Sequence, residues 1–326
     1  MSRKRFNQQM LKFKRAGMFF LGMSFFLMPG QNYYLTRQLS FEPPQTREVS
    51  IIMPEPAAYP ENYTGQPAPI LTAKAALVLD VDSSALIFGK DEKTTLLPAS
   101  TVKIMTALVA LDNYGLEDIL TVQQVKNFGQ DMELVIGEKM TFKNLLAGLL
   151  VFSANDAAWV LAQNYPGREA EFIRAMNNKA KELHLENTYF ANPSGVNSDE
   201  KGKFLTDFSY TTTIDLARLS AEAMKNPIFQ ELVATKQVTV TDVTVKLHHP
   251  LVNLNELLGR VEGIKGIKTG WTEDAQGCLV AYTERNNQRV ISVVLGSDDR
   301  FGETKKLIDW VFTNFHWENL TPTIGD

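Results

Sequence analysis

The chain has 326 residues, 44% of them hydrophobic, which is enough apolar sequence for one large domain or two modest ones. Its mild net charge of −4, with no basic stripe through the body of the chain, argues against a nucleic-acid-binding protein. The single cysteine, Cys278, excludes an intramolecular disulfide and a metal site built from several thiolates.

The first 30 residues carry the pattern of an export signal. Six basic residues lie within the first fifteen positions, and an apolar run from Ala16 to Pro29 follows them. This run is shorter than the roughly 20 residues of a membrane span, yet no good small-x-small cleavage site comes after it. We therefore expect residues 1–30 to be a signal peptide or an uncleaved signal anchor, with a slight preference for the anchor. An anchor would leave the basic flank in the cytoplasm and the rest of the chain outside.

Residues 31–72 are expected to be a linker. Five prolines fall between Met53 and Ile70, and no apolar period is sustained there. Such a tether could hold a folded domain away from a membrane. We expect that domain to begin near Ala73.

From Ala73 the pattern predicts a β-hairpin with a turn near Asp82–Ser84, and then a series of helices with one short strand among them. The expected helices cover residues 96–111, 140–165 with a break near Ser153, 168–185 and 209–226, and the short strand covers 119–125. Strands are expected at 237–247, 262–271 and 277–297, the last with a turn at Asn286–Asn287, before a final helix at 302–315. Strands that precede and follow a block of helices favour an α+β fold, with a helical lobe inserted between the strands of an antiparallel sheet.

A serine and a lysine lie three residues apart in the first expected helix. Ser100 follows Pro98 and could be a helix N-cap, which is the common role of serine at such a place. Ser100 and Lys103 would share one face of a helix whose other residues are mostly apolar. A lysine buried there would lose its proton and could take the proton of a serine nucleophile. A lysine that extends its amine to solvent is the alternative.

Two further motifs favour the catalytic interpretation. A second S-x-x-K, Ser198 to Lys201, lies in a loop-like stretch. An S-x-x-K pattern alone is therefore weak evidence for catalysis. However, S-x-N occurs once, at Ser153–Asn155, and K-T-G occurs once, at Lys268–Gly270. The order S-x-x-K, S-x-N, K-T-G is the signature of penicillin-binding proteins and class A β-lactamases.

With these motifs and the blocks "ANPSGV", "GIKGIKTGWT" and "RFGETKKLIDWVFTNF", the chain resembles the D-alanyl-D-alanine carboxypeptidases, which are low-molecular-weight penicillin-binding serine peptidases. The likeness covers about residues 73–317. It implies a β-lactamase-like fold, with a five-stranded antiparallel sheet flanked by helices and an inserted helical lobe. Some members have an arginine directly after the last strand that contacts the substrate carboxylate. This chain has Ser297–Asp299 there and Arg300 next, which leaves that contact open.

The resemblance also implies a role for each motif residue. Ser100 is expected to be the nucleophile, Lys103 the general base and Ser153 a proton relay. The backbone N–H groups of Ser100 and Trp271 are expected to form the oxyanion hole. The residues expected to bind substrate are Asn155, Lys268, Thr269, Gly270 and Thr272.

The expected activity is removal of the terminal D-alanine from the peptidoglycan pentapeptide, without a metal or cofactor. The expected partners are the stem peptide and, as covalent inhibitors, β-lactam antibiotics. The catalytic domain would cover residues 73–318 and be followed by a tail at 319–326. It would work outside the cytoplasm, at the outer face of the membrane. The second, β-rich domain and the C-terminal amphipathic helix of many members are not expected here.

Three alternatives stay open. A DD-endopeptidase that cleaves cross-links would use the same residues. A class A β-lactamase would need an E-x-x-L-N-type loop, which is not found between Asn155 and Lys268. A peptidoglycan-binding protein without activity would not need the intact motifs. The sequence contains neither H-E-x-x-H nor G-x-S-x-G, and we expect His248–His249 at the surface and Cys278 as a small buried hydrophobe.

Overall fold

The computed structural model describes residues 57–125, 129–197 and 207–319, together with Lys12. Its central element is a five-stranded antiparallel sheet with the strand order β3-β2-β10-β9-β8. The strands are β2 (Ala75–Asp80), β3 (Leu86–Lys90), β8 (Ile264–Thr272), β9 (Gln276–Arg285) and β10 (Gln288–Ser297). The chain between β3 and β8 forms a helical lobe, which confirms the predicted α+β fold.

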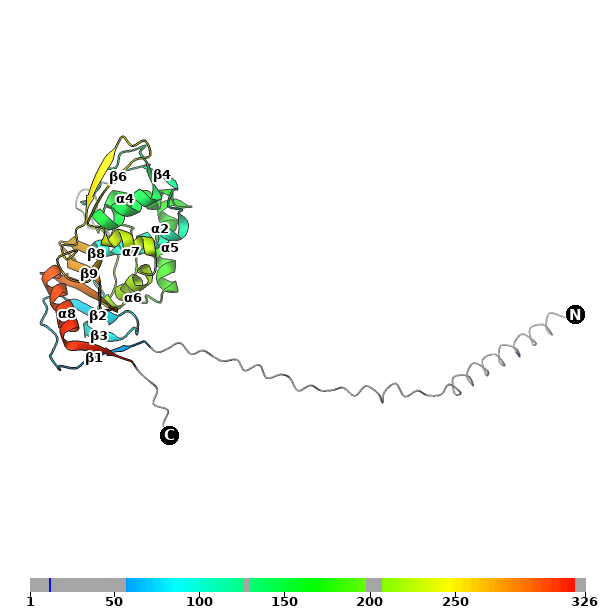
Figure 1. Ribbon diagram of the computed structural model, residues 1–326. Coiled ribbons are helices and arrows are strands. Elements are labelled where there is room, and N and C mark those ends of the chain that lie inside the picture. Colours follow the sequence, from blue (N-terminus) through cyan, green and yellow to red (C-terminus); the bar gives the residue numbers. More distant parts are fainter. Residues whose placement is uncertain (1–11, 13–56, 126–128, 198–206, 320–326) are drawn as a thin grey trace. The chain divides into compact units, whose positions relative to one another are not determined.

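Helices cover both faces of this sheet (Figure 1). On one face α8 (Arg300–Asn314) packs against β9 and β10, and on the other face α6 (Thr213–Ala223) packs against β2 and β10. The remaining helices are the 3₁₀ turn η1 (Ala99–Val102), α2 (Lys103–Asn113), α3 (Phe142–Ala147), the π turn η2 (Gly148–Phe152), α4 (Asn155–Asn164), α5 (Arg168–Glu182) and α7 (Pro227–Ala234).

Strand β2 is apolar on both faces because helices lie above and below it. Ala76 and Val78 belong to the hydrophobic cluster that contains Leu307 of α8. Leu77, which points to the opposite face, belongs to the core of the helical lobe together with Ile291 of β10. The alternation of strand side chains therefore places one set of residues in each layer.

Helix α2 runs through the centre of the lobe and has no polar face for most of its length. All residues from Lys103 to Ala110 are buried, and the helix contacts α4, α5 and α6. A helix that is apolar on all sides is stable only when other elements surround it. This position places its first residue, Lys103, deep inside the protein.

The predicted break near Ser153 is present. The chain leaves α3 through the π turn η2 and then reaches Ser153, whose φ is +65°, before α4 begins. π turns within helices often occur at functional sites. A Cβ on Gly148 in this turn would lie 2.3 Å from the Met132 sulfur, so the glycine allows residue 132 to approach the break.

Three two-stranded ribbons complete the fold: β1 (Tyr59–Asn62) with β11 (Phe315–Glu318), β4 (Ile119–Thr121) with β5 (Lys139–Thr141), and β6 (Gln237–Thr241) with β7 (His248–Val252). The expected linker over 31–72 therefore contains a strand, and ordered structure begins before Ala73. Helix α7 was also not expected. It starts at Pro227, where the Asn226 side chain accepts the N–H groups of Ile228 and Phe229.

The expectation that both adjacent histidines lie at the surface is wrong for one of them. His248 is exposed, but His249 is buried. The reason is that successive side chains of β7 point to opposite faces of the ribbon, and one of these faces is covered.

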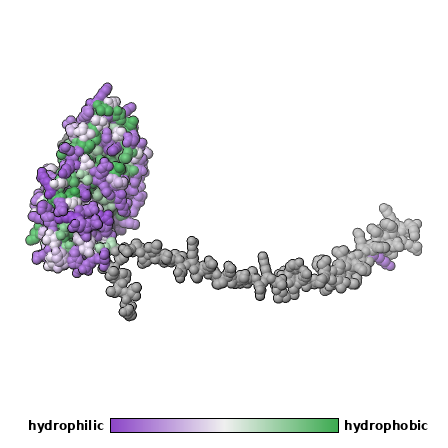
Figure 2. Space-filling view, viewed as in Figure 1, coloured by the Kyte–Doolittle hydropathy of each residue, from purple (hydrophilic) through white to green (hydrophobic). Residues whose placement is uncertain are grey.

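On the face shown in Figure 2, hydrophobic residues are scattered among hydrophilic ones, as is usual for a globular domain. Within the described residues, no helix combines the length and the apolar character needed to cross a bilayer. The signal segment expected at 1–30, apart from Lys12, and the tail from residue 320 lie outside the described residues.

Candidate active site

The amine of Lys103 lies where three parts of the fold meet. Its Nζ is 2.9 Å from Ser100 Oγ, 2.6 Å from Asn155 Oδ1 and 2.8 Å from the backbone oxygen of Ser194. Ser100 belongs to η1, Asn155 begins α4, and Ser194 lies in the loop between α5 and α6. The Lys103 side chain is fully buried, so the alternative of an amine that extends to solvent is wrong.

The three partners of Nζ differ in the hydrogen bonds that they can make. Asn155 Oδ1 and the Ser194 carbonyl oxygen can only accept hydrogen bonds. Ser100 Oγ accepts from Nζ in the structure, and of the three oxygens it alone has a hydrogen that it could donate to a neutral amine. In the neutral form, the two hydrogens of the amine would go to Asn155 and Ser194, which would leave the lone pair for the Ser100 hydroxyl.

The electrostatic surroundings favour the neutral amine. Burial lowers the pKa of Lys103 well below its ordinary value of 10.5, and the charge of Lys268 lowers it further. The carboxylates of Asp131 and Asp156 act in the opposite direction with smaller effect. Desolvation is therefore the largest influence on the pKa of Lys103.

Ser100 is not a helix cap. It lies inside η1, whose cap position is Pro98, and no side chain caps that turn. The residue before it, Ala99, has a φ of +48°, a conformation that is costly for a residue with a Cβ. Such local strain is concentrated at functional sites, where the surrounding structure holds it in place.

Two glycines allow other backbone segments to reach the strained turn. A Cβ on Gly270 would lie 3.0 Å from both Ser100 N and Ala99 Cβ. A Cβ on Gly195 would lie 2.0 Å from the Ala99 oxygen, and its φ is +80°. The glycine of K-T-G thus permits β8 to pack against η1, a reason for glycine that the sequence did not reveal. Ser100 N therefore lies beside Gly270, the residue before Trp271. The ring of Trp271 is exposed.

The sequence did not predict the contact between the Ser194 carbonyl and Lys103, although Ser194 lies in the block "ANPSGV". The Asn192 side chain accepts the backbone N–H groups of Ser194 and Gly195 and donates to the Val196 oxygen. These bonds fold "ANPSGV" into a tight loop, and Thr106 of α2 donates to the preceding carbonyl. A backbone acceptor has no residue type of its own, so only the Asn-Pro and Gly turn residues could have signalled this loop.

The K-T-G strand brings a second buried amine to the site. Lys268 Nζ donates to the Thr269 oxygen at 3.1 Å, and both side chains are buried. Burial, followed by the charge of Arg300, lowers the pKa of Lys268 to about 7. The hydroxyl of Thr272, which was expected to bind substrate, already accepts the Ala275 N–H in the turn to β9.

The other sequence candidates are placed as follows. Ser153 is buried, two residues before Asn155. Cys278 is buried as expected, and burial raises the pKa of its thiol to about 11, so it is not a reactive thiolate. The second S-x-x-K, Ser198 to Lys201, lies outside the described residues.

One group of potential metal ligands is found among the described residues. Glu61, His316 and Glu318 lie on one face of the β1–β11 ribbon, with ligand atoms within 4.8 Å of one another. The two glutamates are exposed and His316 pairs with both of them. None of the three residues contacts the groups around Lys103.

The sequence matches the family described as D-alanyl-D-alanine carboxypeptidase over residues 62–299. The chain belongs to this family of serine peptidases. Among curated relatives, DacF of Bacillus subtilis is 33% identical over 258 residues, which are 76% of this chain and 64% of DacF. The D-alanyl-D-alanine endopeptidase of Escherichia coli is 30% identical over 268 residues, 80% of this chain and 84% of that protein.

Solved structures give the same assignment of the fold. The Streptomyces K15 DD-transpeptidase matches with a TM-score of 0.67 at 29% identity. The match covers 76% of this chain and 100% of the transpeptidase chain. The D-alanyl-D-alanine carboxypeptidase from Mycobacterium tuberculosis has a TM-score of 0.69 at 29% identity, with 81% of this chain and 97% of its own covered. The resemblance stated from the motifs is thereby confirmed.

The environment of Lys103 predicts the behaviour of an Asn155→Asp variant. A carboxylate in contact with Nζ favours the ammonium form, so the pKa of Lys103 rises and the lone pair is lost at neutral pH. We expect acylation by a fluorescent penicillin to fall about a hundredfold at neutral pH and to recover partly at alkaline pH. The measurement is the second-order acylation rate as a function of pH.

Asn178→Asp is the matched control, because it adds the same charge at an exposed position of α5. The control should keep the wild-type pH profile. An Asn155→Asp profile that keeps the wild-type acidic limb would contradict the assignment of Lys103 as the base.

Proposed function

We propose that the chain is a D-Ala-D-Ala carboxypeptidase, which removes the terminal D-alanine of the peptidoglycan pentapeptide through an acyl-enzyme on Ser100. The observation that carries this proposal is the buried Lys103 amine, whose Nζ lies 2.9 Å from the Ser100 hydroxyl and whose pKa burial lowers. Membership in the family supports the class of substrate. The same chemistry would make β-lactams covalent inhibitors of this chain.

In the acylation step, Ser100 Oγ attacks the carbonyl carbon of the D-Ala–D-Ala bond while its proton passes to Lys103 Nζ. The N–H groups of Ser100 and Trp271 stabilise the oxyanion that forms; loss of one such donor typically costs about 10²–10³ in rate. The C–N bond then breaks. The Ser153 hydroxyl, which both donates and accepts, passes the proton from Lys103 to the leaving amine.

In the deacylation step, water attacks the ester carbonyl and gives a proton to the neutral Lys103 amine. The C–O bond to Ser100 breaks, the proton returns to the serine oxygen, and the shortened peptide leaves as a carboxylic acid. Asn155 holds Lys103 throughout through its Oδ1 and offers its amide N–H₂ to the substrate backbone. No step needs a metal or a cofactor.

The substrate carboxylate needs a cationic partner, and two residues beside the K-T-G strand can supply it. Lys268 is buried next to Thr269, and its pKa of about 7 would rise when an anion binds beside it. Arg300, at the start of α8, is close enough for its charge to lower the pKa of Lys268, and its buried Nε has no partner among the described residues. Its charge and its unpaired Nε support Arg300 as the partner of the carboxylate, together with Lys268.

A DD-endopeptidase that cleaves cross-links is the second candidate. The observation that favours it is the 30% identity to the E. coli protein of that name, which is close to the 33% identity to DacF. The two activities use the same bond and differ in the group on the leaving amine. A β-lactamase and a non-catalytic peptidoglycan-binding protein receive less support, and the assay below distinguishes both.

The expected location follows from the substrate, which lies outside the cytoplasm. The basic and apolar pattern of residues 1–30 supports export, either with cleavage or as a membrane anchor. The proline-rich stretch up to β1 would then act as the tether to the outer face of the cytoplasmic membrane.

The acyl-enzyme predicts the effect of Ser100→Ala. This variant should take no label from fluorescent penicillin and release no D-alanine from pentapeptide, because it lacks the attacking oxygen. Ser198→Ala, in the other S-x-x-K, should keep both activities. The measurements are gel fluorescence and D-alanine release by the full chain. A labelled Ser100→Ala variant, or a wild-type protein with neither activity, would overturn the proposed function.

The same assay separates the alternatives. Release from pentapeptide but not from cross-linked dimer supports the carboxypeptidase, and cleavage of the dimer alone supports the endopeptidase. Rapid turnover of penicillin supports a β-lactamase. Reversible binding of peptide without turnover supports a binding protein.

The carboxylate contact predicts a selective defect in Arg300→Gln. We expect kcat/KM to fall about tenfold for a pentapeptide with a free terminal carboxylate, and to stay unchanged for the C-terminal amide. The exposed Arg260→Gln is the matched control and should behave as the wild type. Equal loss on both substrates would show that Arg300 acts on the fold and does not bind the carboxylate.

A further inference from the structure

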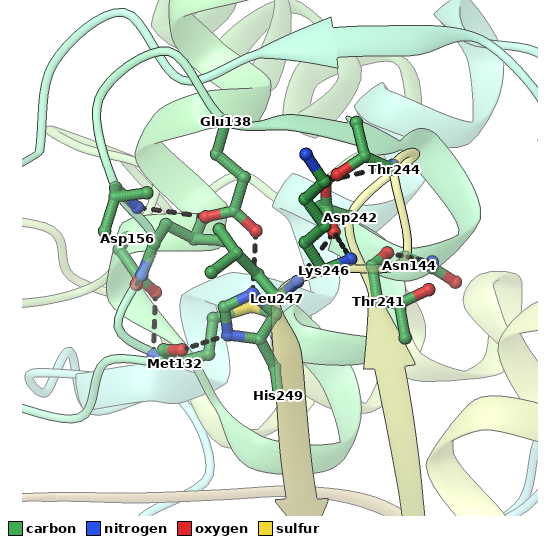
Figure 3. A network of polar contacts seen from close by, with 12 residues as sticks. Met132, Glu138, Asn144, Asp156, Thr241, Asp242, Thr244, Lys246, Leu247 and His249 are labelled. Carbon is green, nitrogen blue, oxygen red and sulfur yellow. Dashed lines mark hydrogen bonds and ion pairs between the residues drawn. The ribbon is translucent and has the colours of Figure 1, made fainter.

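A buried acid–base pair lies away from the groups that touch Lys103. His249 of β7 and Glu138, just before β5, are both buried, and their side chains are in contact (Figure 3). His249 Nε2 is 2.7 Å from Glu138 Oε1, and His249 Nδ1 is 2.7 Å from the Met132 oxygen. The other carboxylate oxygen of Glu138 accepts the Val135 N–H at 3.0 Å.

These contacts join the histidine ring to the chain on both sides. The Met132 carbonyl only accepts, so Nδ1 carries the hydrogen of that bond, and a second hydrogen lies between Nε2 and Glu138 Oε1. Both bonds are removed from solvent. Loss of one partner would leave a buried polar atom without its hydrogen bond, which is costly, so the pair fixes the geometry of the backbone bound to it.

That backbone is the segment 130–138, and its other side is bonded to the start of α4. The N–H groups of Met132 and Leu134 donate to the Asp156 carboxylate at 3.1 and 3.0 Å. The Asn155 N–H donates to the Gln130 oxygen at 2.7 Å. Figure 3 shows Met132 linked to His249 on one side and to Asp156 on the other.

Asn155 is also the residue whose Oδ1 holds the Lys103 amine. We propose that His249 and Glu138 form a positioning pair for Lys103: they hold segment 130–138, which in turn holds the start of α4, where Asn155 contacts the amine. The inference rests on the proposed function, in which Lys103 is the general base. Neither His249 nor Glu138 touches the reacting groups, so both are positioning residues and not catalytic ones.

The charges around His249 give the pair a signature in the pH profile. The titratable groups that face it are Glu138 and, across Met132, Asp156, whose pKa is raised by burial against smaller opposite effects of three backbone N–H groups and of His249. The carboxylate of Asp242, in the turn of the same hairpin, is occupied by the turn backbone. Without the His249–Glu138 contact, segment 130–138 would loosen and admit water to the amine. Because burial is the main cause of the low pKa of Lys103, hydration would raise that pKa.

The test uses His249→Gln, with His248→Gln as its matched control on the exposed face of the same strand. We expect the penicillin acylation rate of folded His249→Gln to fall about tenfold to a hundredfold, and the acidic limb of its pH profile to move to higher pH. His248→Gln should keep the wild-type rate and limb. A His249→Gln variant with a lower melting temperature but an unchanged acylation rate and limb would overturn the proposal.

A second pair of variants tests the other partner of the contact, Glu138. Glu138→Gln should show the same loss of rate, while the exposed Glu133→Gln should not. In the double variant E138Q/H249Q, the loss should be smaller than the product of the two single losses, because both partners of the same contact are then replaced. Multiplicative losses would show two independent effects and contradict the pair.

The outcomes are separate from those of the proposed function. A wild-type protein that takes no penicillin would overturn the function itself, whatever the variants do. Normal labelling of the wild type with unchanged rates in both variants would overturn only the positioning pair. Failure of both buried variants to fold, while both controls fold, would assign the pair to stability alone and also overturn it.

Discussion

A lysine amine held among three oxygens, with no carboxylate in contact with it among the described residues, is the interaction on which the rest of the site depends. Burying a charged ammonium is far more costly than burying a neutral amine that keeps its hydrogen bonds. The fold therefore lowers the pKa of Lys103 and shifts the amine toward its neutral form. A neutral amine that donates to Asn155 and Ser194 would have its lone pair left for the Ser100 hydroxyl.

Each element around the amine has a physical reason to be where it is. Helix α2 is buried on all sides, which excludes water from its first residue. Ala99, directly before Ser100, has a strained φ, and the glycines at 195 and 270 let two backbone segments pack against it. On the far side, segment 130–138 joins the start of α4 to the hairpin β6–β7 through the His249–Glu138 pair.

Most of the site could be predicted from the sequence, because its chemistry needs particular side chains in a particular order. The S-x-x-K, S-x-N and K-T-G motifs identified Lys103 and Asn155, which the structure brings into contact. The apolar neighbours of Lys103 correctly predicted that it is buried. The hairpin of β2 and β3 and the turn at Asn286–Asn287 followed from alternation and from turn residues, since those signals are local.

The remainder depends on contacts between distant parts of the chain. The Ser194 carbonyl is a backbone atom, so no residue type marks it. His249 is buried only because the ribbon β6–β7 packs over segment 130–138, and its neighbour His248 looks the same in the sequence. The strand β1 lies in a proline-rich stretch and forms because β11 is there to pair with it. Such pairings require the tertiary structure.

The most direct measurement of the central claim is the titration of the Lys103 amine itself. Carbon-13 NMR of the lysine Cε resonances, with the Lys103 signal assigned by its loss in Lys103→Arg, follows this one group through the pH range. The account predicts that Lys103 titrates well below its ordinary value of 10.5 in the free protein. Titration of Lys103 at or above 10.5 would show a stable ammonium and would contradict the account.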